Sequence, residues 1–223
     1  MTSGSIWKQM TFFAMPIFLG NLFQQLYNTV DSLIVGNFLG SSALAAVSSS
    51  GSLIFMLIGF LSGISAGAGV IVARFFGAGD EKNLQRAVHT TVAFGLVAGV
   101  LMTGVGVALS PQILRWMDTP ESVMRESVTY LQIYFAGSLG FVMYNVLVGI
   151  LQAVGDSRHP LYYLIVSSVI NLVLDLLFIT GFHTGVGGAA VATVISQIVS
   201  ALLCFWQLLR TKESYGLKIR KIR

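Results

Sequence analysis

The chain has 223 residues, of which 55% are hydrophobic and only 10% are charged. Soluble domains carry about 25% charged residues, because water has to wet their surface. The composition therefore excludes a soluble enzyme or a disordered chain and indicates a protein that crosses a membrane several times. The single cysteine, Cys204, excludes an intramolecular disulfide framework and a cysteine-rich metal site.

Charged residues divide the sequence into long uncharged stretches. Runs of 22, 42, 28, 29 and 34 residues without an Asp, Glu, Lys or Arg follow Lys8, Asp31, Arg86, Glu126 and Asp175. A helix needs about 20 mostly apolar residues to span a bilayer. We therefore expect an all-α, polytopic membrane protein whose residues 1–209 form one lobe of six transmembrane helices. Their expected ranges are 11–35, 46–73, 87–110, 124–152, 160–180 and 187–209.

The basic residues predict the orientation of these helices. If the amino terminus is cytoplasmic, 11 of the 13 Lys and Arg residues fall inside, and only Arg115 and Arg125 fall outside. The positive-inside rule therefore places both termini in the cytoplasm (N-in and C-in). This topology explains the net charge of +4 better than nucleic-acid binding does. Residues 210–223 are then either a basic cytoplasmic tail or a linker that leads to a further segment.

Two acidic residues, Asp31 and Asp175, fall inside predicted helices. Placing a carboxylate there costs at least about 2.5–3.5 kcal/mol, so such a residue is by default a functional hypothesis for ion or proton handling. The alternative is a hydrogen bond that serves helix packing, or a position close to the membrane interface. Desolvation penalises the charged form of a carboxyl group, and such a group can therefore carry a proton reversibly.

Polar residues of three predicted helices recur at the spacing of a helix face. They are Gln24, Asn28 and Asp31 with Tyr27 beside them in the first helix, Asn171 and Asp175 in the fifth, and Thr193 and Gln197 in the sixth. A rise of about 1.5 Å per residue places both acids and Thr193 in the outer half of the bilayer. We therefore expect one pocket whose oxygen atoms bind H⁺ or Na⁺.

Small residues form two rows on predicted helices. Gly59, Gly63 and Gly67 recur every four residues in the second helix, and Gly95 and Gly99 repeat that spacing in the third. Such rows let helices approach closely, so packing is the first interpretation. Sliding or bending of these helices during transport is the alternative.

The sequence also contains an enzyme-like signal, Gly77-Ala78-Gly79-Asp80, which spells the GxGD of intramembrane aspartyl proteases. Asp80 is followed by Glu81-Lys82, which predicts a turn in water and not a catalytic acid in the membrane. The sequence has no GxxxxGK[ST] loop for a nucleotide. We expect no enzyme, no catalytic residue and no cofactor, and no metal beyond Na⁺.

In their order along the chain, these residues resemble the multidrug and toxic compound extrusion (MATE) transporters. The resemblance covers essentially the whole sequence. It is carried by Tyr27-Asn28-Thr29-Val30-Asp31, Gly77-Ala78-Gly79-Asp80, Leu151-Gln152-Ala153-Val154-Gly155-Asp156-Ser157, Asn171-Leu172-Val173-Leu174-Asp175 and Gly185-Val186-Gly187-Gly188-Ala189. No single segment is specific, but their order and placement together are.

The resemblance implies multidrug efflux by a secondary active antiporter, which exchanges bulky, often cationic compounds for H⁺ or Na⁺. In the DinF-like branch, a proton- or cation-binding site of the amino-terminal lobe uses residues that correspond to Asp31, Asn171, Asp175 and Thr193. Candidates for the drug cavity are Gln24, Tyr27, Asn28, Asn145 and Gln197. The expected location is the plasma membrane, most simply a bacterial inner membrane.

The resemblance also implies a missing partner, because members of the family have two six-helix lobes. This sequence matches the amino-terminal six-helix lobe. The second lobe would belong to the same chain in a full-length form or to a dimer partner. A half-size subunit, or a membrane binding module that does not transport, is the alternative function. The other expected partners are drugs or metabolites and the lipid bilayer, and nucleic acid is not expected.

Overall fold

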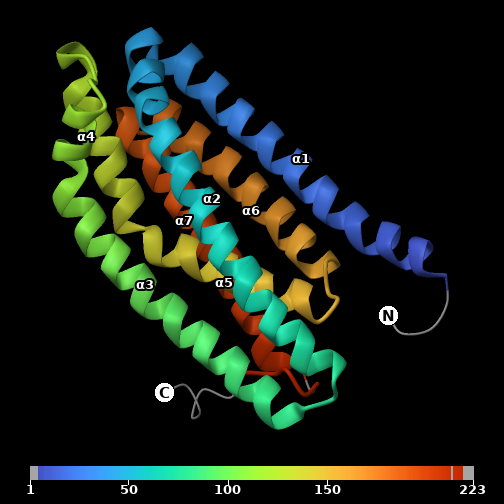
Figure 1. Cartoon of the computed structure of the whole chain (residues 1–223). Helices are drawn as coiled ribbons and strands as arrows, with labels where there is room; N and C mark the ends of the chain where they lie inside the picture. The colour runs from blue at the N-terminus through green and yellow to red at the C-terminus, as the bar shows by residue number, and fades with distance from the viewer. Residues whose placement is uncertain (1–4, 212, 218–223) are drawn as a thin grey trace.

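A computed structural model describes residues 5–211 and 213–217 of the chain (Figure 1). In these residues every regular element is helical, which confirms the all-α prediction. The elements are α1 (Ile6–Leu39), α2 (Ser41–Gly77), α3 (Glu81–Trp116), α4 (Glu121–Ala136), α5 (Ser138–Ala153), α6 (Arg158–Leu176), a π-helical turn η1 (Leu177–Gly181) and α7 (Gly185–Arg210).

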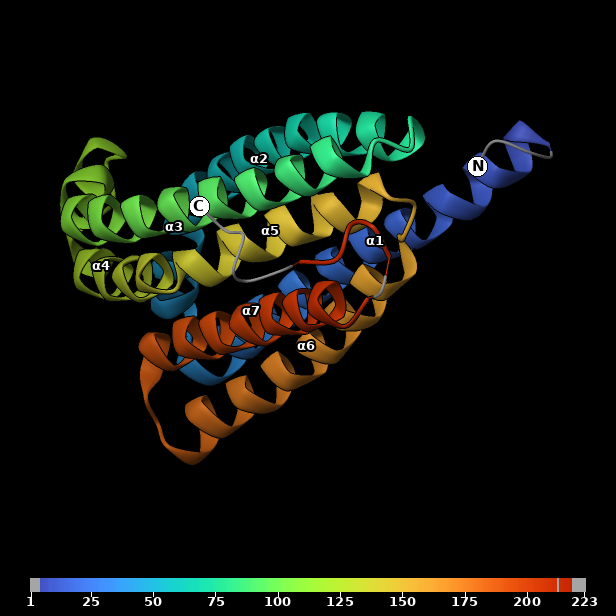
Figure 2. The ribbon, with the colours of Figure 1, turned by 90° about the horizontal axis from the view of Figure 1, so that it is seen from below.

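Helix α5 lies in the middle of the bundle. Figure 2 shows α2 and α3 on one side of it and α6 and α7 on the other. Its apolar side chains, among them Val146, Ile150 and Leu151, join a buried cluster with residues of α2, α3 and α7. Helix α1 packs against α6 and α2 at the edge of the bundle, and its first turns extend beyond the other helices (Figure 1).

The range 124–152 is two helices and not the single helix that the sequence suggested. α4 and α5 meet at Gly137 and are bent by 50° relative to each other. A Cβ atom at Gly137 would lie 2.4 Å from the side chain of Val194, so only glycine lets this junction lie against α7. An uncharged run of residues does not predict such a break, because hydropathy carries no information on how closely two backbones pack.

The other helices extend beyond the predicted apolar ranges. α1 and α2 reach from Ile6 to Leu39 and from Ser41 to Gly77, so a single residue, Gly40, separates them. Its φ of 89° is a conformation that glycine adopts without a steric penalty. The predicted fifth helix, 160–180, is α6 followed by the π turn η1. A run of apolar residues indicates the part of a helix that spans the membrane, but it does not indicate helical turns that continue into water.

Among the described residues, four helical segments are long and apolar enough to cross a membrane: α2, α3, α6 with η1, and α7. The bent pair α4–α5 would make a fifth span. Helix α1 has the length, 34 residues, but carries amides and Asp31 along it. The chain is a multi-pass membrane protein, and the count of six spans with both termini inside stays a prediction.

We call one end of the bundle the basic end. It consists of the α2–α3 turn, the α5–α6 turn and the end of α7, and it carries Arg74, Lys82, Arg86, Arg158 and Arg210. These residues belong to the set that the positive-inside rule assigned to the cytoplasm. The remaining basic residues of the predicted tail, Lys212, Lys218, Arg220, Lys221 and Arg223, lie outside the described residues.

The segment 213–217 folds back onto the basic end. The Gln85 side-chain amide donates hydrogen bonds to the backbone carbonyls of Ser214 and Gly216, the latter at 3.0 Å. Leu217 is 5% exposed and joins the apolar cluster around α5. The ring of Tyr215 meets that of Phe76 edge-on at 6.0 Å. The segment after α7 therefore holds the ends of α2 and α3 together.

Candidate functional site

The structure brings the two intramembrane acids together. Asp31 on α1 is 9% exposed and Asp175 on α6 is fully buried. Their carboxyl groups lie within hydrogen-bonding distance of each other. Ionised carboxylates only accept hydrogen bonds, so a hydrogen bond between two carboxyl groups requires a proton on at least one of them. The close approach of the two carboxyl groups is therefore favourable when one of them carries a proton.

Asn171 and Thr193 connect this pair to α7. The Asn171 amide is assigned with its nitrogen toward Asp175, because only this orientation satisfies both of its polar atoms. Its nitrogen then donates to Asp175 Oδ2 at 2.9 Å and its oxygen accepts from the Thr193 backbone nitrogen at 3.3 Å. The Thr193 hydroxyl donates to the Ala189 carbonyl at 3.0 Å. Tyr27 of α1 lies close to this hydroxyl, whose oxygen could then only accept from the Tyr27 hydroxyl. Polar side chains of α1, α6 and α7 thus gather in one cluster.

Three oxygen atoms in this region have no hydrogen-bond partner among the described residues. They are Oδ1 of Asp31, Oδ1 of Asp175 and Oε1 of Gln197, and all three are buried. A buried acceptor without a partner costs about 1–3 kcal/mol, so such atoms call for a proton, a cation or a water molecule. These oxygens suit either of the two predicted coupling ions.

A cavity of about 230 Å³ opens onto this cluster. The polar candidates that line it are Gln24, Tyr27, Asn28, Asp31, Thr193 and Gln197. Asn171 and Asp175 do not line it, but they reach it through Asp31 and Thr193. Asn145 lies elsewhere: its amide donates to the Phe141 carbonyl at 2.9 Å, and its side chain lines a neighbouring cavity.

The sequence reasoning missed an aromatic wall of the same cavity. It consists of Tyr130 and Tyr134 of α4 and Phe141 of α5. The two tyrosine rings are stacked with centroids 6.5 Å apart, and Tyr134 lies 6.1 Å from Phe141. The four-residue spacing of the tyrosines is a signal that could have placed them on one helix face. Such rings bind flat aromatic molecules and cations.

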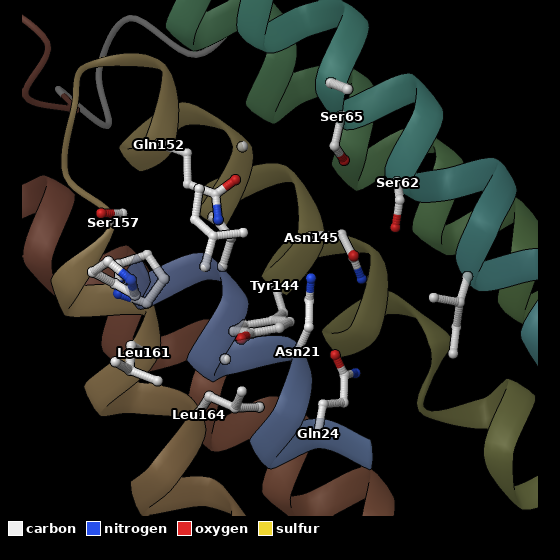
Figure 3. Close-up of a pocket in the computed structure, with 18 residues that line it drawn as sticks. Asn21, Gln24, Ser62, Ser65, Tyr144, Asn145, Gln152, Ser157, Leu161 and Leu164 are labelled. Atoms are coloured by element: carbon white, nitrogen blue, oxygen red, sulfur yellow. The ribbon is translucent and has the colours of Figure 1, made fainter. Parts of the chain in front are cut away.

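The neighbouring cavity, of about 240 Å³, lies nearer the basic end, between α1, α2, α5 and α6. Figure 3 shows amide and hydroxyl side chains from α1, α2 and α5 around its interior. Its polar residues are Asn21, Gln24, Ser62, Ser65, Tyr144, Asn145, Gln152 and Ser157. Gln24 and Ile58 line both cavities. Of the residues that the structure describes, no charged one lines the cavity nearer the basic end.

Asp80 lies far from this cluster, in the turn between α2 and α3. It accepts from the Asn83 backbone nitrogen at 3.1 Å and from its side-chain amide at 2.6 Å. These hydrogen bonds, with Lys82 and Arg86 nearby, lower the pKa of Asp80 below its usual range. Gly79 before it has φ of 67°. The predicted turn is confirmed, and Asp80 is the N-cap of α3.

The model of the MatE family matches residues 16–177, which include both acids. The chain belongs to the MATE family. Its relatives include "Probable multidrug resistance protein YoeA" of Bacillus subtilis, 37% identical over 94% of this chain and 46% of that protein. DNA damage-inducible protein F of Escherichia coli is 28% identical over 88% of this chain and 43% of that protein. This MATE chain spans about half the length of the curated relatives it matches.

Solved MATE structures share the fold. One described as MATE in the bent conformation superposes with a TM-score of 0.90 at 27% identity, covering 99% of this chain and 49% of that one. A MATE transporter described as outward-facing gives 0.89 over 99% of this chain, and one described as inward-facing gives 0.82 over 90%. The family is one of membrane transporters, and its bacterial members agree with a multi-pass protein of a bacterial cell membrane.

Proposed function

We propose that the chain is the amino-terminal lobe of a cation-coupled multidrug exporter. The observation that carries the proposal is the pair of buried acids, Asp31 and Asp175, at the edge of a cavity with an aromatic wall. A second six-helix lobe would close the open side of this cavity. It comes from the same polypeptide in a full-length form or from a partner chain. The family membership and the names of the relatives support export of drugs.

The acid pair couples the movement of the drug to that of the proton, because both compete for one negative charge. With its shared proton the pair is compact, because the hydrogen bond between the carboxyl groups draws α1 to α6. Loss of the proton leaves two carboxylates side by side, and at close range in a weakly polar medium their repulsion is large. A cationic drug in the cavity offsets that charge at Asp31. Drug and proton therefore favour opposite states of the same pair.

Of the two candidate coupling ions, H⁺ or Na⁺, we expect H⁺. A carboxyl–carboxyl hydrogen bond needs a proton and leaves no room between those two oxygen atoms for a metal ion. Sodium would have to bind the three unpartnered oxygens instead, and Ca²⁺ or Na⁺ sites use several oxygen ligands around one point.

Drug flux in proteoliposomes tests the proposal. The chain, alone and with a carboxy-terminal lobe of a relative, is reconstituted, and pH and Na⁺ gradients are imposed separately. We expect drug movement driven by the pH gradient, and Asp175→Asn to abolish it while the protein still inserts. Glu126→Gln, on the exposed face of α4, is the matched control and should transport normally. Unchanged flux in Asp175→Asn contradicts the assigned role.

A second experiment, chemical crosslinking, distinguishes the forms of the assembly. Crosslinking in native membranes should give no stable homodimer if the second lobe belongs to the same polypeptide. A homodimer that transports would identify a half-size subunit. A homodimer that binds drug without moving it would identify the alternative, a membrane binding module.

A further inference from the structure

The cavities of the lobe follow one another along α1. The cavity at the acid pair and the uncharged cavity share Gln24 and Ile58. The uncharged cavity shares Ser157 with a third, of about 180 Å³, at the basic end. Residues of α1 line all three, from Gln9 and Phe12 in the third to Asp31 in the first. The three form a series from the basic end to the acid pair.

The middle cavity has the properties of a hydrated space. The side-chain amides of Asn21, Gln24 and Gln152 line it and have no hydrogen-bond partner among the described residues. A polar group deprived of water in the membrane costs several kcal/mol unless another group satisfies it. A cavity of about 240 Å³ is large enough for several water molecules, each of which needs two to four polar partners. Amides from α1 and α5 offer such partners.

The end of the series faces water. The Asp156 carboxylate lies 2.6 Å from Nδ1 of His159, and the Arg158 guanidinium lies 4.3 Å above the ring of Phe12. Asp156 lies in the α5–α6 turn, Arg158 and His159 begin α6, and Asp156 and Arg158 line the third cavity. Charges of both signs at this point, at the basic end, indicate contact with the aqueous phase. Ser157 between them is 5% exposed and belongs to both cavities.

We propose that these cavities form a hydrated route along α1, through which the acid pair exchanges its proton with the aqueous phase at the basic end. A proton that leaves the Asp31 carboxyl passes to a water molecule as hydronium, and the carboxylate remains. Gln24 lies at the junction of the two inner cavities and controls passage between them. That the route carries protons rests on the proposed function, whereas its hydration does not.

Accessibility of single cysteines to Ag⁺ tests the route in the chain itself, reconstituted in sealed lipid vesicles of both orientations. Cys204→Ala removes the native thiol. Ser62→Cys reports the middle cavity and Ser32→Cys the cavity at the acid pair. Lys82→Cys identifies the vesicles whose basic end faces the outer solution. Thiols that have not bound Ag⁺ are then labelled with a fluorescent maleimide after denaturation.

Val173→Cys is the matched control. Val173 and Ser62 lie equally far along their helices from the basic end: Val173 from Arg158, the start of α6, and Ser62 from Gly77, the end of α2. The Val173 side chain is 57% exposed on the surface of the bundle. From the basic end we expect Ser62→Cys to react at least about tenfold faster than Val173→Cys, because the reactive thiolate forms only where water reaches it. Equal rates at the two positions would overturn the proposal.

A plug at the junction gives the second readout. Gln24→Phe should slow the reaction of Ser32→Cys from the basic end at least about tenfold and leave Ser62→Cys unchanged, because only Ser32 lies beyond the junction and thiolate reactivity follows access. Gln24→Asn should leave both rates unchanged. If Gln24→Phe has no effect on Ser32→Cys, the two cavities are not in series. If the cysteines react as expected but no ion gradient drives drug flux, the proposed function is refuted and the hydrated route is not.

Discussion

Two rows of glycine with the same spacing have opposite surroundings. On α3, Cβ atoms at Gly95 and Gly99 would lie 3.0 and 2.6 Å from side chains of α5, so this row is closed. On α2, no described atom lies within 4 Å of where Cβ atoms would stand at Gly59, Gly63 and Gly67. The close-packing interpretation is therefore confirmed for the α3 row within this lobe, whereas the α2 row packs against none of the described residues.

The reason is the face of α2 that meets α5. Gly149 of α5 approaches α2 so closely that a Cβ would lie 3.1 Å from the Ser65 carbonyl oxygen. Ser65 follows Gly63 by two residues, and two residues rotate a helix by about 200°. The open row therefore lies on the opposite side of α2, away from the packed core. Small residues at a spacing of four show which positions share a face, but not what that face touches.

The largest effect that this comparison predicts comes from filling the closed row. Gly99→Val would place a branched side chain against the backbone and side chain of Leu139. Overpacking a close contact costs about 1–3 kcal/mol, so the midpoint of thermal unfolding in detergent should fall by several degrees. Gly63→Val on the open row is the matched control. Equal losses in the two variants would contradict the difference between the rows.

A smaller loss should follow when the ends of α2 and α3 are released from each other. Gln85→Ala removes both hydrogen bonds to the segment 213–217. At about 1 kcal/mol net for such bonds, we expect a modest fall in the unfolding midpoint and faster proteolysis after α7. Gln112→Ala, at an exposed position on the same helix, is the control. If proteolysis is unchanged, the segment does not depend on Gln85 for its position.

The turn between the two helices makes the next prediction, and its sign follows from the pKa of Asp80. Hydrogen bonds from Asn83 lower that pKa, so the carboxylate stabilises the folded state at neutral pH. The contribution is lost as the pH falls through the lowered pKa, where Asp80 takes up a proton. The unfolding midpoint of Asp80→Ala should therefore lie below that of the native chain at pH 7, and the gap should narrow on acidification. A constant gap from pH 7 to pH 3 would contradict the capping role.

Comparison of sequence and structure shows which features a linear pattern carries. Asp31, Asn171, Asp175 and Thr193 could be grouped because a charge or an amide in an apolar helix is costly and so stands out. Their burial in one cluster agrees with that grouping, and their role in coupling stays a prediction. The bend at Gly137 and the aromatic wall of Tyr130 and Tyr134 could not be placed, because both depend on which helix faces which.

The smallest effect should come from the open row and is the most informative about the missing lobe. Gly63→Ala adds a methyl group that meets no described atom, and alanine is a better helix former than glycine by about 1 kcal/mol. In this chain alone the change should be neutral or raise the unfolding midpoint slightly. If a second lobe closes against this face of α2, the same substitution should instead weaken the two-lobe assembly, because small residues let helices approach. Crosslinking yield with and without a carboxy-terminal lobe, compared between Gly63→Ala and the native chain, measures the difference. A gain in stability that persists unchanged in the assembly would show that this row faces lipid.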